Sequence, residues 1–245
     1  RYPQLRRGMV AIFCYVGAEV AIGSLIISFL SLASVMSFQE DVAKHYLSLY
    51  WGGAMTGRFL GAVALNKGTA FIRRAGIMLV IGGGMFVLLM AMNATGPVAP
   101  ADLWPMAVLI VINIVVLLVA GPDPSRAMAL FACSAMVLLG VVITGEGPLA
   151  MWSILAIGLF NSILWSNIFT LSIKDLGTDT AQGSSLLVMM ILGGALIPQV
   201  QAAIIDFLGA QKYTTMGFHV SFILPLLCYA YLAWFGWRGT KAHTA

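Results

Sequence analysis

Long, almost uninterrupted runs of apolar residues restrict the fold of this chain more than any other feature of its sequence. Charged residues make up only 9% of the 245 positions, whereas a soluble domain has about 25%. A run of about 20 apolar residues can cross the ~30 Å hydrocarbon core of a bilayer as a helix. Inside lipid every backbone amide must be bonded internally, and a helix achieves this within one segment. The predicted fold class is therefore an all-α membrane protein, a polytopic helix bundle.

We read eight such runs as membrane spans. They are Met9–Val35, Tyr46–Leu65, Ala75–Met92, Leu103–Ala120, Ser125–Thr144, Leu149–Ser172, Ser184–Leu208 and Phe218–Trp237. An even number of spans puts both termini on one side, and that side receives most of the basic residues. These are Arg1, Arg6, Arg7, Lys67, Arg73, Arg74, Arg126, Lys174, Arg238 and Lys241. The positive-inside rule then predicts cytoplasmic termini, and no nucleic acid is needed to explain the basic excess. Aromatic residues that fit an outer interfacial belt are Tyr46, Tyr50, Trp51, Trp104 and Trp152.

The first span contains a single acid, Glu19, in the apolar stretch FCYVGAEVAIGS. It lies roughly 15 Å from the cytoplasmic end, near the bilayer midplane. An acid there costs about 2.5–3.5 kcal/mol and should face protein or a water-filled cavity. Burial favours its protonated form, which can carry a proton or hydrogen-bond a hydroxyl ligand. The alternative is a protonated acid that only ties two helices together. Tyr15 and Gly23 lie one turn away on the same face.

Two later spans also carry polar residues at depth. Asn161 lies near the middle of the sixth span, and Trp165 follows one turn later as a candidate stacking surface. The alternative is that Asn161 bonds a neighbouring helix and Trp165 fills space. In the seventh span, Pro198 removes the amide that would bond the Gly194 carbonyl, so a kink is expected before Gln201. Such a bend is tolerated where it lines a cavity; the alternative is a packing kink with glutamines bonded between helices.

The second span combines small residues with one base. Gly53, Gly57 and Gly61 recur every four residues and give a smooth face for helix packing. Arg58 lies about 12 Å from the cytoplasmic end, close enough to snorkel, and we interpret it as structural. The sequence has no HExxH, GxSxG, Walker or CxxC pattern and no clustered set of metal-binding residues. We therefore expect no enzyme activity, no metal and no organic cofactor.

Five stretches, in order along the chain, resemble the C-terminal half of the sugar:proton symporters of the fucose–galactose–glucose group, in the major facilitator superfamily. They are FCYVGAEVAIGS, LYWGGAMTGRFLGA, MWSILAIGLFNSI with IFTL, GSSLLVMMILGGALIP and LPLLCYAYLAWFG. The resemblance covers most of the chain except its third and fourth spans. It implies two six-helix bundles with sugar bound between them at mid-membrane. The chain would then be the second bundle, and the N-terminal bundle would lie outside it.

The resemblance also implies which residues line the sugar cavity. Glu19, Asn161 and Gln201 match positions that would bond sugar hydroxyls, with Trp165 or Tyr15 stacking on the ring. Glucose and galactose members tend to have an acid where Glu19 stands, whereas the fucose type has a glutamine. In fucose-type relatives the proton-carrying acids lie in the other half, so Glu19 is expected to bind sugar rather than carry the coupling proton.

The chain departs from the family pattern in two places. In the sixth span, the family's Met, Phe, Pro and Thr are replaced by Leu164, Trp165, Ser166 and Asn167. Without that proline the span is expected to be straight. The stretch that begins FACSAM matches the third helix of the family's bundle, so Ala75–Ala120 is expected to be an extra two-span hairpin.

We therefore expect a secondary transporter that moves a glucose-, galactose- or fucose-like hexose across the inner (plasma) membrane with proton coupling. This chain would supply the C-terminal half of the substrate cavity. Its expected partners are the sugar, the lipid bilayer and the N-terminal bundle of the same transporter. The alternative is a non-transporting sugar receptor, or a scaffold assembled from half-bundles.

Overall fold

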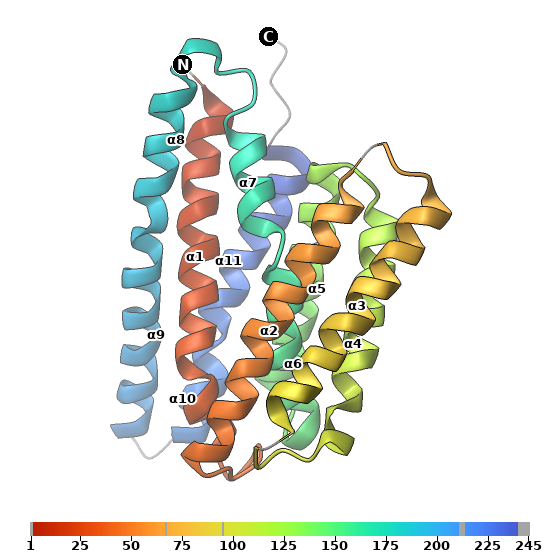
Figure 1. Cartoon of the computed structure of the whole chain (residues 1–245). Helices are drawn as coiled ribbons and strands as arrows, with labels where there is room; N and C mark the ends of the chain where they lie inside the picture. The colour runs from red at the N-terminus through yellow and green to blue at the C-terminus, as the bar shows by residue number, and fades with distance from the viewer. Residues whose placement is uncertain (1, 67, 95, 211–213, 240–245) are drawn as a thin grey trace.

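A single bundle of long helices makes up the structure, which is a computed structural model that describes residues 2–66, 68–94, 96–210 and 214–239. Within these ranges it contains helices and turns and no strand, which confirms the all-α class. Figure 1 shows the helices standing side by side, with the start of α1 and the end of α11 at the same end of the bundle.

The α-helices are α1 (Pro3–Leu30), α2 (Glu40–Ala64), α3 (Phe71–Asn93), α4 (Trp104–Ala120), α5 (Pro124–Thr144), α6 (Gly147–Asn161), α7 (Leu164–Ser172), α8 (Thr180–Met189), α9 (Gly193–Ala210), α10 (Thr214–Ser221) and α11 (Ile223–Trp234). Short 3-10 segments are η1 (Pro100–Leu103), η2 (Gly177–Asp179) and η3 (Met190–Leu192), and a π-helical turn, Phe235–Gly239, extends α11.

Seven helical segments of the described chain are long and apolar enough to cross a membrane. They are Pro3–Leu30, Phe71–Asn93, Pro100–Ala120, Pro124–Thr144, Gly147–Ser172, Gly177–Ala210 and Thr215–Arg238. The remaining expected span, Tyr46–Leu65, lies within α2, which is less apolar and is not among the seven. Because α2 packs against α1, α3 and α6, much of its surface faces protein. The eight-span topology stays a prediction.

The sixth expected span is interrupted, so the prediction of a straight helix is wrong. Regular α6 ends at Asn161 and α7 begins at Leu164. Two serine hydroxyls bond to the backbone near the break: Ser162 donates to the Leu159 carbonyl and Ser166, in the first turn of α7, to the Ile163 carbonyl. Side chains that bond to the backbone in this way compete with the helical ladder and often bend it.

The seventh expected span contains a 3-10 turn that the sequence did not predict, while the kink at Pro198 stays a prediction. Pro198 lies inside α9, and the departure from α-helix comes about two turns earlier, in η3. Directly after that segment, Gly193 packs against the backbone of Phe13 in α1. The absence of a side chain at Gly193 lets the two helices approach this closely.

Close backbone contacts at glycines are expected to control the stability of the bundle. A Cβ at Gly193 would overlap the Phe13 carbonyl, and one at Gly158 would overlap the Tyr50 carbonyl, whereas a Cβ at Gly83 in α3 would meet nothing within 4 Å. Gly193→Ala and Gly158→Ala should each destabilise the fold by about 1–3 kcal/mol through overpacking. Gly83→Ala, the matched control, should be neutral or stabilising by up to about 1 kcal/mol.

Thermal unfolding of the intact protein in detergent, followed by tryptophan fluorescence, measures these differences. Equal midpoints for all three alanine variants would show that the close approach of α1 to α9 and of α2 to α6 is absent in solution.

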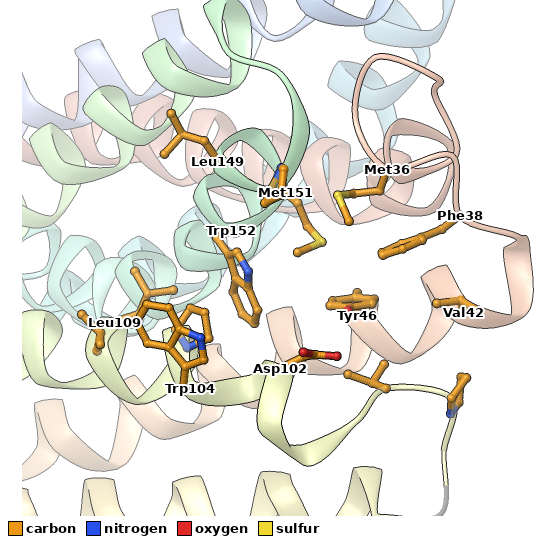
Figure 2. A pocket seen from close by; sticks show the side chains of 15 residues that line it. Met36, Phe38, Val42, Tyr46, Asp102, Trp104, Leu109, Leu149, Met151 and Trp152 are labelled. Carbon is orange, nitrogen blue, oxygen red and sulfur yellow. The ribbon is translucent and has the colours of Figure 1, made fainter.

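The hairpin of α3 and α4 packs on the outside of the bundle, against α2 and α6 (Figure 1). Helix α3 exposes a row of apolar side chains, among them Leu79, Val80 and Val87. A cavity of about 800 Å³ lies at the end of the bundle opposite the start of α1 (Figure 2). It is lined by the α3–α4 hairpin, by the turn between α1 and α2, and by the beginnings of α2 and α6.

Candidate functional site

Glu19 lies in the middle of α1, and its carboxylate forms an ion pair with a neighbouring helix. The side chain is 12% exposed, and its Oε1 atom lies 3.6 Å from Nη2 of Arg58 in α2. That oxygen is buried and accepts no hydrogen bond. The two groups therefore attract each other by charge, but their distance is longer than a hydrogen bond. The Oε1 atom of Glu19 can still accept a hydrogen bond.

Arg58 lies at the surface of the bundle, where the sequence suggested only a snorkelling side chain. Its side chain is 54% exposed, and Met55 and Phe59 beside it in α2 are also exposed. The guanidinium group thus lies between the buried carboxylate of Glu19 and the exposed face of α2 that carries Met55 and Phe59, which we call the open face. A molecule on this face would meet Arg58 first, because the Oε1 atom of Glu19 is buried behind the guanidinium group.

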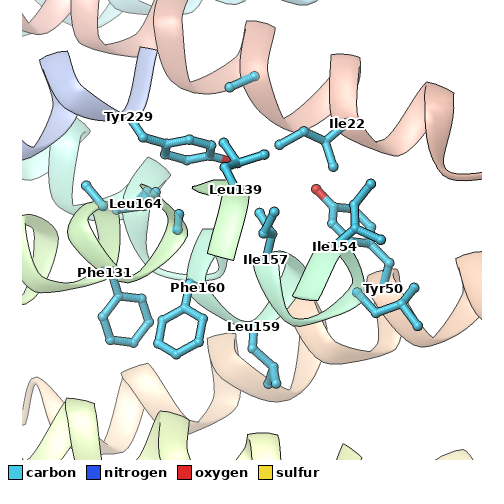
Figure 3. Packing of buried hydrophobic residues seen from close by; sticks show 14 of the residues in the cluster. Ile22, Tyr50, Phe131, Leu139, Ile154, Ile157, Leu159, Phe160, Leu164 and Tyr229 are labelled. Carbon is cyan, nitrogen blue, oxygen red and sulfur yellow. The ribbon is translucent and has the colours of Figure 1, made fainter. Parts of the chain in front are cut away.

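Asn161, at the end of α6, is the centre of a buried network of three tyrosines. Its Oδ1 atom accepts a hydrogen bond from Tyr229 of α11 at 2.6 Å, and its Nδ2 atom donates to the Tyr50 hydroxyl of α2 at 2.9 Å. The Tyr15 hydroxyl of α1 donates to the Asn161 carbonyl at 3.2 Å. The Tyr50 hydroxyl is in turn 3.4 Å from the Glu19 carbonyl. Figure 3 shows Tyr50 and Tyr229 among the packed side chains around α6.

This network ties four helices together at one level. Asn161, Tyr15, Tyr50 and Tyr229 are at most 1% exposed, and a buried polar group is tolerated only when it is hydrogen-bonded. The prediction that Tyr50 belongs to an interfacial aromatic belt is therefore wrong, because its hydroxyl points to Asn161 rather than to water. Asn161 does meet neighbouring helices, as one interpretation of the sequence expected.

Trp165 is the second residue of α7 and is half-buried. Its ring is 6.4 Å from the Tyr15 ring and 6.4 Å from that of Phe169, with which it stacks at 25°. The next residue, Ser166, is exposed. Since α1 contacts both α2 and α7, Glu19 and Tyr15 lie between Arg58 on one side and Trp165 on the other.

Gln201 of α9 is fully buried and points to a different helix. Its Nε2 atom donates to the Ser221 hydroxyl of α10 at 3.1 Å, and Ser221 donates to the Phe218 carbonyl. Its Oε1 atom is buried without a hydrogen-bond partner. The structure therefore brings Glu19, Tyr15, Asn161 and Trp165 together, whereas Gln201 is bonded within the α9–α10 contact.

Sequence reasoning missed Arg58, Tyr50 and Tyr229 as members of this site. A signal for Arg58 was present, because one acid and one base lie deep in consecutive spans that run antiparallel, and each is costly to bury alone. No comparable signal identified Tyr229, since a tyrosine in an apolar run is equally typical of a packed core.

Comparison with characterised proteins identifies homologues over nearly the whole chain. It is 34% identical over 242 residues to the glucose/galactose transporter of Brucella abortus, covering 99% of this chain and 44% of that protein. It is 32% identical over 234 residues to a putative glucose/galactose transporter of Helicobacter pylori, covering 96% of this chain and 43% of that protein. A shorter match, 32% identical over 107 residues, is to the L-fucose-proton symporter of Escherichia coli. No protein-family model matches the chain.

A solved structure shares the fold. The crystal structure of the major facilitator superfamily transporter FucP in the outward conformation matches with a TM-score of 0.63 and 24% identity, covering 98% of this chain and 42% of that one. The chain thus spans less than half the length of the relatives it matches. Its major facilitator fold, its homology to these sugar transporters and its apolar helices indicate a multi-pass membrane protein.

Proposed function

We propose that this chain, a homologue of the glucose/galactose transporters with the major facilitator fold, is the C-terminal half of a secondary transporter. The transporter would move a hexose-type sugar across the inner (plasma) membrane with proton coupling, with both termini of this chain in the cytoplasm. The observation that carries the proposal is the Glu19–Arg58 pair, in which a buried acid oxygen without a hydrogen bond lies 3.6 Å from a half-exposed base. Such intramembrane charges mark ligand or ion pathways.

The open face supplies one wall of a sugar site. The Glu19 carboxylate would accept hydrogen bonds from sugar hydroxyls, Arg58 would donate to a hydroxyl oxygen, and Trp165 would stack on the ring. A hydroxyl beside the pair would bridge it from one side, donating to Glu19 and accepting from Arg58. The second wall would come from an N-terminal bundle that rocks against this one, as in alternating access.

The remaining proposed residues, Tyr15, Asn161 and Gln201, are more deeply buried than Arg58 and Trp165. Tyr15 lies between Glu19 and Trp165 and is positioned by its bond to Asn161. Asn161 and Gln201 would reach a sugar only by exchanging their present bonds to Tyr50, Tyr229 and Ser221. We therefore assign Asn161 primarily to positioning the tyrosines.

Uptake by proteoliposomes tests transport against the alternative of a sugar receptor or scaffold. The intact protein should accumulate labelled glucose or galactose when the lumen is made alkaline, and a protonophore should abolish accumulation above equilibrium. L-Fucose should be accumulated less well if the acid at Glu19 favours glucose-like hexoses. Saturable sugar binding without any accumulation would instead establish the receptor, and neither binding nor accumulation would contradict a sugar function.

A further inference from the structure

The cavity of about 800 Å³ is lined by neither Glu19 nor Arg58 and lies where α2 and α6 begin, at the opposite end of the bundle from the start of α1 (Figure 1). Its walls come from the turn before α2, the first turns of α2 and α6, and the α3–α4 hairpin. The hairpin supplies Pro97, Val98, Asp102, Trp104 and Leu109. The segment that the sequence predicts to be an addition to the family bundle therefore supplies part of the lining of this cavity.

Aromatic rings form much of the lining of the cavity. Phe38 stacks on Tyr46 with ring centroids 5.0 Å apart and an 18° angle, and Tyr46 meets Trp152 edge to face at 6.3 Å. Trp104 stands at the rim and is 65% exposed. Figure 2 shows Tyr46, Trp152, Trp104 and Asp102 around the same space. The electron-rich faces of such rings attract cations.

Asp102 is the charged residue among those that line the cavity. Its carboxylate is exposed, and within the described residues it forms no salt bridge. An exposed carboxylate beside several aromatic rings presents a negative potential to a bound group, so charge complementarity favours a cationic ligand.

The rest of the lining decides between a small polar cation, a sugar and a lipid. Apart from Asp102 and a few ring N–H and O–H groups, the walls are apolar, including Val108, Leu109, Leu149 and Met151. A sugar would leave most of its hydroxyls without partners here, which is costly. Val108 and Leu149 are exposed on the outside of the bundle, so an acyl chain could continue from the cavity along the helices.

The cavity's position agrees with a lipid ligand. It lies where the apolar segments Pro100–Ala120 and Gly147–Ser172 begin, that is, at the depth of the headgroups if these segments cross the bilayer. Tryptophan and tyrosine are enriched at this level of a membrane, and a cavity of this volume falls within the usual range for ligand sites of about 300–1,000 Å³.

We propose that this cavity binds one phospholipid with an ammonium headgroup, of the ethanolamine or choline type. The ammonium group lies against Asp102 and the rings of Tyr46 and Trp152, and an acyl chain follows the apolar wall past Leu109 and Leu149. The lipid thereby fills the space between the α3–α4 hairpin and the bundle. This site is separate from the proposed sugar site and does not depend on transport.

Native mass spectrometry of the intact protein, delipidated in detergent and titrated with lipid, tests the proposal. The probes are phosphatidylethanolamine and phosphatidylglycerol with identical acyl chains. The wild-type protein should retain one phosphatidylethanolamine about tenfold more strongly than phosphatidylglycerol, as expected for one charge pair with cation–π support. Asp102→Asn should lower that ratio most of the way towards one and leave only the part that the aromatic rings supply. Glu146→Gln, which removes another exposed acid at the same end of the bundle, should leave it unchanged.

A second variant separates the apolar wall from the charge. Trp104→Leu should weaken both lipids together without restoring phosphatidylglycerol to parity, because it removes ring area at the rim. An unchanged preference in Asp102→Asn, or equal retention of the two lipids by the wild-type protein, would overturn the proposal. Displacement of the ethanolamine lipid by millimolar glucose or galactose would also overturn it and would assign the cavity to a sugar.

Discussion

Glu19→Gln is expected to reduce hexose uptake by about 10- to 150-fold at low sugar concentration. Glutamine keeps the size of the side chain but replaces a charged acceptor of hydroxyl groups by a neutral amide. Hydrogen bonds to a charged group contribute about 1.5–3 kcal/mol, and a loss of that size corresponds to this fold-change in affinity. The change should therefore appear mainly as weaker sugar binding, measured as a raised concentration for half-maximal uptake in proteoliposomes.

Two further variants identify the cause of that loss. Asp206→Asn, which neutralises an exposed acid of α9, is the matched control and should transport normally. Arg58→Gln should also reduce uptake, because it leaves Glu19 without its cation and removes a donor to the sugar. If Arg58 acts through Glu19, then Arg58→Gln should have a much smaller effect when combined with Glu19→Gln than in the wild-type protein. Wild-type uptake by Glu19→Gln would refute the assignment of this face to sugar.

Asn161→Leu is expected to cause one of the largest losses of stability available to a single substitution in this chain. It removes the acceptor of Tyr229 and the donor to Tyr50, both at positions with no exposure. An unsatisfied buried polar group costs about 1–3 kcal/mol, so we expect a total of about 2–4 kcal/mol. For a domain of this size, that corresponds to a fall in Tm of roughly 5–15 °C.

A double-mutant cycle shows whether the network, rather than side-chain volume, sets this cost. Tyr229→Phe should destabilise the wild-type protein by about 1–3 kcal/mol, because it leaves the Asn161 Oδ1 atom without a donor. When it is combined with Asn161→Leu, the same change should be neutral or stabilising, since it removes a hydroxyl that has already lost its partner. Additive effects of the two substitutions would mean that Tyr229 and Asn161 do not interact.

The sequence predicts the helical architecture well because the lengths of apolar runs are dictated by bilayer thickness and backbone bonding. It also identifies Glu19, because an isolated acid in such a run is energetically conspicuous. It predicts the interruptions of helices less well. The 3-10 turn at Met190–Leu192 was not predicted, and the bend expected at Pro198 stays a prediction. The sixth span is interrupted after Asn161 although the family's proline is absent.

The partners of buried polar groups depend on packing that a single sequence does not encode locally. Asn161 meets Tyr50 and Tyr229 from positions 111 and 68 residues away in the chain. Gln201 has the same residue-level signal as Asn161, a polar side chain deep in a span, but it bonds Ser221 at the α9–α10 contact. Only the arrangement of the helices separates these two cases.

Site-directed cysteine labelling tests most directly whether the Glu19 face lines a cavity that sugar enters. Ser166, exposed beside Trp165 in α7, would be changed to cysteine in the intact protein after Cys14, Cys133 and Cys228 are replaced by alanine. Thr144→Cys, at the exposed end of α5, is the control. A membrane-impermeant maleimide should label both variants, and saturating glucose or galactose should slow labelling only at Ser166→Cys. A Ser166→Cys protein that still transports hexose, but whose cysteine is either inaccessible to the reagent or labelled at the same rate with and without sugar, would contradict the account.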